Sequence, residues 1–450
     1  GLRPCGGTRV LRHRNAFNCC CGGQYPVYRW HMNQGARNHG MRKAATVLAV
    51  AMTLSAAACS SNDDGSKSSG SSGAGSSNAS GASGSQGASG ASSAQPGSSN
   101  APGLAAGKSI DIGGSGDILV HVPVRDDAAH NAAAKGAKGY DFDPMFANVT
   151  KPISALDLAI CHMETPLSTT NTNLSIPATL SFNVPHEVAG SLKRAGFDGC
   201  DRVGNHVIDR GIQGVGETKK SLDDAGLKNQ GPTPTPSTGQ SAVMYDVKGV
   251  KVAQLAYSYT TGNADASNTV VPPEWPWLKY WQFPVVKAEG ILADAKKAKA
   301  AGADVVVLSM HWGKEYSIPA STEQRELAAK LLASDDVDTI LGTHVHVPQS
   351  CEKINGKYVV YGMGNFLSNQ GPSVNSSLKP STQDGMIVDV KLTKGDDGKV
   401  TQQLTYQPTH VNLAGHVIEL ATPTKNADAY GRVKAAMTQL GSKCDATPAS

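Results

Sequence analysis

Two histidines separated by one residue, His344 and His346, carry the clearest chemical signal in this 450-residue chain. They follow an apolar run at residues 337–341 and a glycine, so we expect an extended loop that presents both imidazoles just after a strand. Neutral imidazole nitrogens at this spacing suit one metal ion or two neighbouring ions. Nearby histidines alone are more often ordinary surface residues. The pair gains weight because other polar residues also follow predicted strands: Asp117, Glu164, Asn205 with His206, and His311.

The elements that must position these residues alternate between strand and helix from residue 108 onward, which predicts a layered α/β domain. Strands are expected at residues 109–112, 157–161, 197–203, 304–310, 337–341, 358–361 and 385–392, the last nearer an edge. Helices are expected at residues 185–195, 214–225, 284–301 and 322–333, the last opened by a capping box at Ser321. Asp117 is expected after a glycine-rich turn that follows the first strand.

Ligands gather at the carboxyl ends of strands in folds of this kind, so we expect the polar residues to meet at one edge. Mixed nitrogen and oxygen ligands suit Zn, Mn or Fe. Two such ions, about 3.5–4 Å apart, would need a bridging carboxylate and could serve a hydrolase. The sequence therefore predicts a site for one or two divalent ions.

The basic residues of this chain are concentrated near its N-terminus, where a segment predicts export. Residues 1–43 hold eight of the 41 basic residues and no acidic ones, which leaves 33 Lys and Arg against 37 Asp and Glu. This balance gives no clustered basic face, and it argues against nucleic-acid binding. Met41, two basic residues, an apolar stretch and Cys59 are similar to a bacterial lipoprotein signal at residues 41–59, with Cys59 as the lipid anchor. An ordinary secretory signal is the alternative.

The segments on either side of this signal have no pattern of a packed core. We interpret residues 1–40 as a non-native or mis-annotated leader; a metal or redox cluster at Cys19–Cys21 is the alternative. Residues 60–107 are almost wholly Ser, Gly, Ala and Asn, which predicts a disordered tether with a reach of roughly 35–40 Å. Four cysteines remain in the folded part. Cys161 and Cys200 are expected as free buried thiols, and Cys351–Cys444 is a possible bridge.

The motifs resemble, in order, those of the bacterial capsule-synthesis CapA/PgsA family of poly-γ-glutamate proteins. The matching segments are residues 116–121, 139–146, 157–167, 195–198, 204–211, 311–316, 342–349 and 361–366. The resemblance implies a layered αββα sandwich of the calcineurin-like metallophosphoesterase type. It implies metal ligation by Asp117, Glu164, Asn205, His311, His344 and His346. His206 would be the general acid or transition-state donor, and Asp209 would orient it.

The chain departs from the calcineurin-like pattern at its first motif, which is usually Asp-x-His. Asp117 is followed here by Ile118 and Leu119, and His121 cannot be assumed to fill the role. His121 and His162 are therefore weak candidates for the site. Asn365 and Glu315 are expected to line the pocket, whereas Trp312, Tyr316 and Phe366 are expected to pack around it.

The resemblance predicts a lipoprotein of the cell envelope that takes part in poly-γ-glutamate synthesis or processing. Its metal-dependent hydrolase activity would act on phosphoesters or γ-glutamyl amides. The expected partners are poly-γ-glutamate or another anionic polymer, the membrane through the lipid anchor, and other capsule-synthesis subunits. A non-catalytic polymer-binding or export subunit and a general extracytoplasmic metallophosphatase are the alternatives. The expected domain spans residues 108–395, with a β-rich extension at 396–450.

Overall fold

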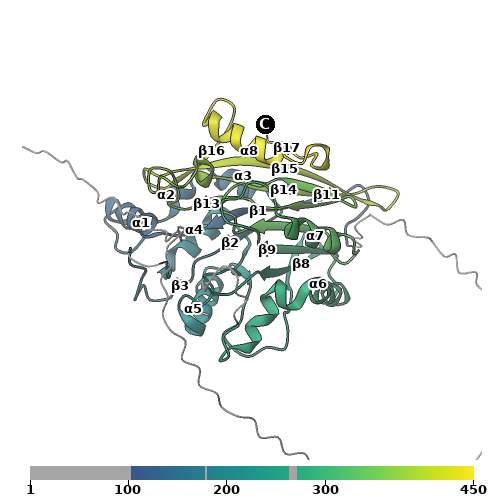
Figure 1. Ribbon diagram of the computed structural model, residues 1–450, viewed down its shortest axis with the longest axis horizontal. Coiled ribbons are helices and arrows are strands. Elements are labelled where there is room, and N and C mark those ends of the chain that lie inside the picture. Colours follow the sequence, from purple (N-terminus) through teal and green to yellow (C-terminus); the bar gives the residue numbers. More distant parts are fainter. Residues whose placement is uncertain (1–102, 178–179, 263–270, 450) are drawn as a thin grey trace, which may run out of the picture. The chain divides into compact units, whose positions relative to one another are not determined.

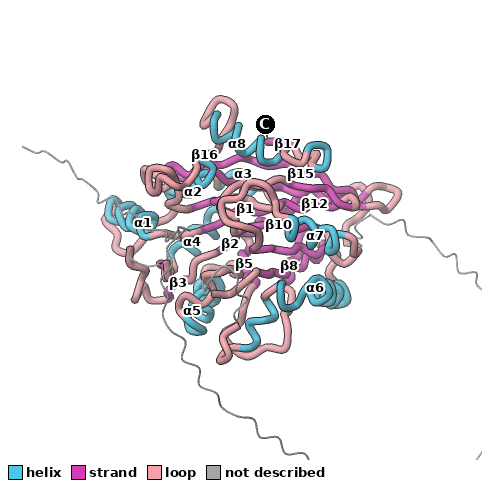
Figure 2. The backbone as a smooth tube through the Cα atoms, in the orientation of Figure 1, coloured by secondary structure: helices cyan, strands magenta, loops and turns pink. Residues whose placement is uncertain are grey.

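The computed structural model describes residues 103–177, 180–262 and 271–449 of the chain. The predictions for the leader, the lipoprotein signal with Cys59 and most of the tether lie outside these residues. Two large sheets organise the described part (Figures 1 and 2). No helix of the described ranges is long and apolar enough to cross a membrane.

The first sheet has the strand order β16-β15-β14-β1-β2-β5-β6, with β13 beside β1 and β17 beside β15. Its strands are β1 (Ser109–Ile118), β2 (Leu158–Met163), β5 (Gly199–Asp201), β6 (Lys228–Gln230), β13 (Asn365–Leu367), β14 (Asp384–Lys394), β15 (Val400–Asn412), β16 (Val417–Leu420) and β17 (Thr447–Pro448). The strands from β1 to β6 run parallel to one another, and β14 and β15 are antiparallel. This sheet supplies one half of the predicted site.

The second sheet has the order β11-β12-β10-β9-β8-β7. Its strands are β7 (Val243–Val247), β8 (Val250–Ser258), β9 (Val305–His311), β10 (Thr339–Thr343), β11 (Cys351–Ile354) and β12 (Lys357–Val360). A small third sheet pairs β3 (Leu167–Ser168) with β4 (Val184–Pro185). The central strands β8, β9, β10 and β12 are parallel, so their carboxyl ends meet at one edge.

Side chains alternate along the strands between two apolar layers, as the strand period requires. On β2, Leu158 and Ile160 belong to the core between the sheets, whereas Ala159 packs toward the helices. The same alternation on β9 sends Val305 inward and Val306 outward. The predicted αββα layering is confirmed by these separate cores.

Helices cover the outer face of each sheet. The first sheet packs against α1 (Val122–Ala134), α2 (Asp143–Phe146), α3 (Thr150–Ser154), α4 (Glu187–Ala195) and α5 (Gly211–Asp224). The second packs against α6 (Phe283–Ala300) and α7 (Thr322–Leu332). The predicted capping box at Ser321 is present, since its side chain accepts from the Gln324 N–H. The last helix, α8 (Ala427–Met437), lies against β14 and β15, close to the C-terminus of the chain (Figure 1).

Two strand predictions were wrong. Asp117 does not follow a turn, because β1 continues through the glycines to Ile118. These glycines allow close approach of neighbouring strands: a Cβ on Gly116 would lie 1.8 Å from the Gly364 carbonyl oxygen. The strand at residues 385–392 is not near an edge either. β14 lies between β1 and β15, because the residues after it add a partner strand along its whole length.

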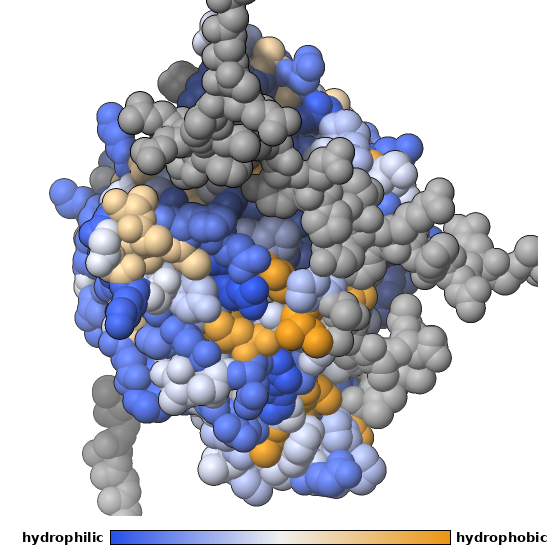
Figure 3. Space-filling view, turned by 90° about the vertical axis from the view of Figure 1, so that its left-hand side faces the viewer, coloured by the Kyte–Doolittle hydropathy of each residue, from blue (hydrophilic) through white to orange (hydrophobic). Residues whose placement is uncertain are grey.

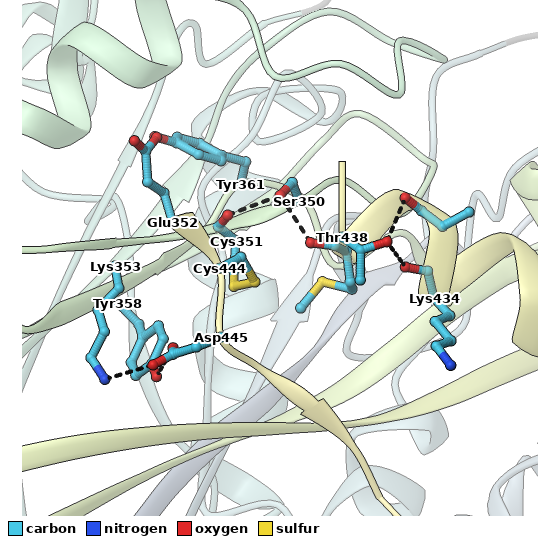
Figure 4. Close-up of a disulfide and its surroundings, with 12 residues drawn as sticks. Ser350, Cys351, Glu352, Lys353, Tyr358, Tyr361, Lys434, Thr438, Cys444 and Asp445 are labelled. Atoms are coloured by element: carbon cyan, nitrogen blue, oxygen red, sulfur yellow. Dashed lines mark hydrogen bonds and ion pairs between the residues drawn. A yellow bond between two sulfur atoms is a disulfide. The ribbon is translucent and has the colours of Figure 1, made fainter. Parts of the chain in front are cut away.

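The cysteine prediction was half right. The bridge that was only possible from the sequence, Cys351–Cys444, is present and ties β11 to the C-terminal segment, beside the 3.1 Å ion pair of Lys353 with Asp445 (Figure 4). Cys161 and Cys200 are not free thiols, because β2 and β5 are adjacent and place their Cα atoms 4.3 Å apart, within bonding reach. Both bridges lie in the folded part.

Candidate metal centre

The carboxyl ends of strands from both sheets supply the predicted ligands. Asp117 lies at the end of β1, Glu164 directly follows β2, and His311 is the last residue of β9. Asn205 comes from the loop after β5, and the two closely spaced histidines follow β10. All six ligands predicted from the resemblance are buried at one site: Asp117, Glu164, Asn205, His311, His344 and His346.

Short contacts connect these side chains across the two sheets. His346 Nδ1 lies 3.0 Å from Asp117 Oδ2, and its Nε2 lies 3.7 Å from Glu164 Oε1. On the other side, His311 Nε2 lies 3.1 Å from Asn205 Oδ1. Nitrogen and oxygen atoms at these separations can point at common ions as well as at each other.

Two three-residue groups have ligand atoms that all lie within 4.8 Å of one another and share one carboxylate. Glu164 groups with His311 and His344, and also with Asp117 and His162. A third group joins Glu315 to His344 and His346. A shared carboxylate between two adjacent ligand sets is what a pair of divalent ions requires.

The chemistry of the buried atoms fits a cation. Both carboxylate oxygens of Glu164 are buried with no hydrogen-bond partner among the described residues, and so is Nδ1 of His344. Buried polar atoms without partners are costly unless an ion or water satisfies them. Mixed imidazole and carboxylate ligands favour Zn, Mn or Fe over Ca or Mg.

Without a cation, the site is electrostatically frustrated. Burial raises the pKa of Glu164 to about 7. Burial, together with the neighbouring His346, lowers the pKa of His344 to about 3. Although burial works against it, the charges of Glu164 and Asp117 raise the pKa of His346 to about 10. One cluster therefore holds neutral and charged imidazoles around a carboxyl group whose ionised form is disfavoured.

The backbone that carries the two adjacent histidines is held in an unusual conformation. His344 has φ 90° and His346 has φ 57°, in the left-handed region that favours glycine. Such conformations cost on the order of 1–3 kcal/mol each and persist where the surroundings fix them. Here the His344 N–H donates to Asp117 Oδ1 at 3.0 Å, so one carboxylate fixes the loop of the opposite sheet.

The residues predicted to act as acid and orienting carboxylate contact each other. His206 Nδ1 lies 2.7 Å from Asp209 Oδ2, and the ring packs edge-on against Phe182 at 4.7 Å. The same carboxylate oxygen accepts the Phe182 N–H at 2.7 Å. With Nδ1 engaged, Nε2 is the atom left to exchange a proton with a substrate.

An open groove of about 460 Å³ lies beside the loop that carries His206 and Asp209, between α5 and the segment after β3. Its polar lining includes Asn183, Gln213 and Arg210, the residue that follows Asp209. Arg210 donates to the Asn173 carbonyl oxygen at 2.5 Å. Figure 3 views the side on which α1 and β3 lie; it is mostly hydrophilic, with apolar side chains in a few small patches.

The secondary candidates separate into two groups. Asn365 Oδ1 lies 3.1 Å from His346 Nδ1, so it touches the site, and Glu315 approaches it from the exposed side. His121 packs edge-on against Phe182 at 5.5 Å, the ring that also contacts His206, and its Nδ1 lies 3.0 Å from the Leu119 carbonyl oxygen and 3.2 Å from the Asn369 nitrogen. Trp312 is buried and donates to the Tyr361 carbonyl oxygen, as expected for a packing residue.

His162 is the residue that the sequence motifs undervalued. It stands directly opposite Asp117 in the parallel pairing of β1 with β2, and its side chain is fully buried. The Asp-x-His pattern seeks a histidine on the same strand as the aspartate. His162 lies on the neighbouring strand β2, and only the register of the sheet shows that it is beside Asp117.

Comparison with known families agrees with the motif order. Residues 112–370 match the family described as bacterial capsule synthesis protein PGA_cap. The chain belongs to this bacterial capsule synthesis family. The match includes every predicted ligand and extends from β1 to the segment after β13.

Individual relatives carry related names. The chain is 27% identical over 286 residues to the PGA biosynthesis protein CapA of Bacillus subtilis, covering 63% of this chain and 70% of that protein. It is 28% identical over 234 residues to the capsule biosynthesis protein CapA of Bacillus anthracis, covering 52% of this chain and 55% of that protein. The chain therefore spans little more than half of this second relative.

Solved structures with detectable similarity are more distant. The calcineurin-like phosphoesterase YfkN of Bacillus subtilis is 14% identical, with a TM-score of 0.36 over 72% of this chain and 97% of that chain. The sulfate thiohydrolase SoxB of Thermus thermophilus is 16% identical, with a TM-score of 0.34 over 71% of this chain and 46% of that chain. The fold class of this protein therefore rests on its own two sheets.

Proposed function

We propose that this protein is a metal-dependent hydrolase of the cell envelope that acts in the synthesis or processing of an anionic capsule-type polymer such as poly-γ-glutamate. The observation that carries the proposal is Glu164, which groups with His311 and His344 within 4.8 Å and whose two carboxylate oxygens are buried without a hydrogen-bond partner in the described ranges. The polymer is proposed from the names of two relatives, which refer to capsule and PGA biosynthesis.

The residues divide the chemical work between them. Asp117, Glu164, Asn205, His311, His344 and His346 would hold the divalent ions, which supply a Lewis acid and an activated water. Glu164 would contribute a carboxylate to the site together with His311 and His344. His206, in its doubly protonated form, would donate the Nε2 proton to the leaving group, and Asp209, which accepts from Nδ1–H, would stabilise that charged form and orient the ring.

The groove beside Arg210 offers a place for the part of the substrate that does not react. Its amide and guanidinium groups can bind the carbonyls and carboxylates of a polyamide chain. Hydrogen bonds connect this groove to His206. Ser181, which lines the groove, donates its hydroxyl to the Asp209 carbonyl oxygen at 3.0 Å, and the Asp209 carboxylate contacts His206. A bound polymer would therefore pass close to the proton donor.

A position outside the cytoplasm is part of the proposal. The lipoprotein-like signal at residues 41–59 and the Ser/Gly-rich tether favour an anchored, exported domain. Two disulfides in the folded part add independent support, because such bridges persist in oxidising compartments. Contacts with other capsule-synthesis subunits belong to the same proposal.

A non-catalytic polymer-binding subunit is the second candidate, favoured by one observation. The first motif has Ile118 and Leu119 where calcineurin-like enzymes usually have a histidine, so one ion would have a poorer ligand set. A site of that kind could serve structure or binding without turnover.

The deciding experiment combines metal analysis with substrate screening of the full chain. We expect stoichiometric Zn, Mn or Fe that falls sharply in His344→Ala and not in His130→Ala, whose side chain is 79% exposed. Hydrolysis of poly-γ-glutamate that requires the metal and His206 would support the proposal. Metal binding without turnover on the polymer or on phosphoesters would favour the binding subunit, and turnover on phosphoesters alone would favour a general phosphatase.

A further inference from the structure

A buried chain of side chains leads from the interior of the first sheet to the candidate metal centre. Asp201 Oδ1 lies 2.6 Å from His162 Nδ1, and His162 Nε2 lies 3.0 Å from His311 Nδ1. The far nitrogen of His311, Nε2, lies 3.1 Å from Asn205 Oδ1. His162 and His311 are fully buried, and Asp201 is 2% exposed, so water does not compete for these contacts.

With a cation at Nε2 of His311 and the Asp201 carboxylate at the other end, the order of donors and acceptors in this chain is fixed. An ionised carboxylate only accepts, so the Nδ1 atom of His162 carries a proton and donates it to Asp201. The Nε2 lone pair of His162 then accepts from the Nδ1–H of His311. In that tautomer the Nε2 lone pair of His311 would bind the cation beside the Asn205 oxygen, 3.1 Å away. Imidazole ligands of metals characteristically donate their second N–H to a partner in this way.

We propose that His162 and Asp201 are positioning residues that orient His311 as a metal ligand, so that metal affinity at this site depends on two groups that touch no ion. The inference rests on the proposed metal centre and goes beyond it, since these residues lie outside the ligand set implied by the family motifs. The usual single carboxylate partner of a metal-bound histidine is extended here by a second imidazole.

The sheet holds this arrangement in register. His162 and Asp201 are directly opposite each other on the parallel strands β2 and β5, and the preceding pair is the Cys161–Cys200 disulfide. A covalent cross-link one residue away prevents the strands from slipping or separating at this point. Gly204 completes the fit from the other side, because a Cβ there would lie 3.2 Å from His311 Cε1.

A competing assignment makes His162 itself a ligand. Its Nε2 lies 3.9 Å from Asp117 Oδ1, and both residues group with Glu164. The shorter 3.0 Å contact with His311 favours the positioning role, since one nitrogen lone pair cannot serve both partners. The two assignments predict different numbers of bound ions in a variant that lacks the His162 imidazole, so a measurement of metal stoichiometry distinguishes them.

The test measures Zn²⁺ affinity and stoichiometry of the full chain by equilibrium dialysis, and the visible absorption of the Co²⁺-loaded protein. Asp201→Asn preserves shape and removes the charge, and His162→Phe keeps a ring and removes both nitrogens. Asp127→Asn is the matched control, because Asp127 Oδ2 also lies 2.6 Å from a histidine, His416, outside the ligand groups. Circular dichroism establishes that each variant is folded.

We expect Asp201→Asn to bind the same number of ions with an affinity weakened about 10- to 100-fold and with an altered Co²⁺ spectrum. Asp127→Asn should match the parent chain. An Asp201→Asn variant with parental affinity and spectrum would overturn the proposal, even if His162→Phe failed to fold. Loss of one whole ion in His162→Phe with an unchanged Asp201→Asn would make His162 a ligand instead. A parent chain that binds no Zn²⁺ or Co²⁺ would refute the metal centre itself.

Discussion

Replacing Glu164 by glutamine should reverse the order of stability between variant and parent when metal is added. Glu164→Gln keeps the size of the side chain and removes its charge. In metal-free protein the carboxylate is buried without a hydrogen-bond partner among the described residues, so the charged form is unfavourable. With metal present, the same carboxylate would be the shared ligand, and its loss should cost binding.

The magnitude follows from the pKa. Burial raises the pKa of Glu164 from 4.5 to about 7, which corresponds to about 3 kcal/mol of destabilisation once the group is ionised. This cost is absent below pH 4.5, where both folded and unfolded chains are protonated, and complete above pH 7. Removing the charge should recover this free energy, but burying the glutamine amide should itself cost roughly 1 kcal/mol. We therefore expect Glu164→Gln to be more stable than the parent by about 1–2 kcal/mol at pH 8 in EDTA.

Urea unfolding at pH 8 measures both halves of the prediction. Zn²⁺ at 100 times its dissociation constant should stabilise the parent by about 2.7 kcal/mol and leave Glu164→Gln unchanged. Glu289→Gln, at an exposed position of α6, is the control and should follow the parent in both conditions. A variant less stable than the parent in EDTA would refute the electrostatic reasoning. Equal stabilisation of both by Zn²⁺ would refute the role of Glu164 as a ligand.

Three further predictions concern separate features. His206→Ala should lower turnover about 10²- to 10⁴-fold with unchanged metal content, and loss of metal along with turnover would contradict a proton-donor role. Replacing Cys161 and Cys200 together by alanine should lower the free energy of unfolding by up to about 4 kcal/mol, from the entropy of a loop with a sequence separation of 39; unchanged urea midpoints would argue against the bridge. Burial and nearby Asp111 raise the pKa of Asp389 from 3.8 to about 6, so destabilisation by its ionised form grows between these pH values and is complete above the higher one. Asp389→Asn should therefore gain about 1 kcal/mol at pH 7, a gain that fades toward pH 4 in urea titrations; a gain independent of pH would exclude this cause.

Much of the site could be predicted because its ligands follow strands along the chain. An apolar run such as residues 337–341 predicts a buried strand, and the polar residues that follow it must lie at the carboxyl edge of the sheet. The same reasoning failed for β1, whose glycines resemble a turn. They are small because the β14, β2 and β13 backbones approach there, and that closeness is a property of the assembled sheet.

Contacts between strands account for the other misses. Cys161 and Cys200 pair, and His162 meets Asp201, because β2 lies next to β5 with one particular register. The chain order alone does not specify which strands are neighbours or how they align. His162 therefore resembled an ordinary buried polar residue, although its position opposite Asp117 brings it to the centre of the site.

The hairpin of β14 and β15 has a practical consequence for anyone who expresses a shorter fragment. The family match ends at residue 370, before β14 begins, yet β14 covers one side of β1 over residues 109–115. A fragment cut at that boundary would leave the backbone of the central strand open to pairing with other molecules, a common origin of aggregation. A fragment that keeps this strand covered should therefore extend beyond the family-matched residues to Cys444, whose bridge to Cys351 fastens the added strands to the second sheet.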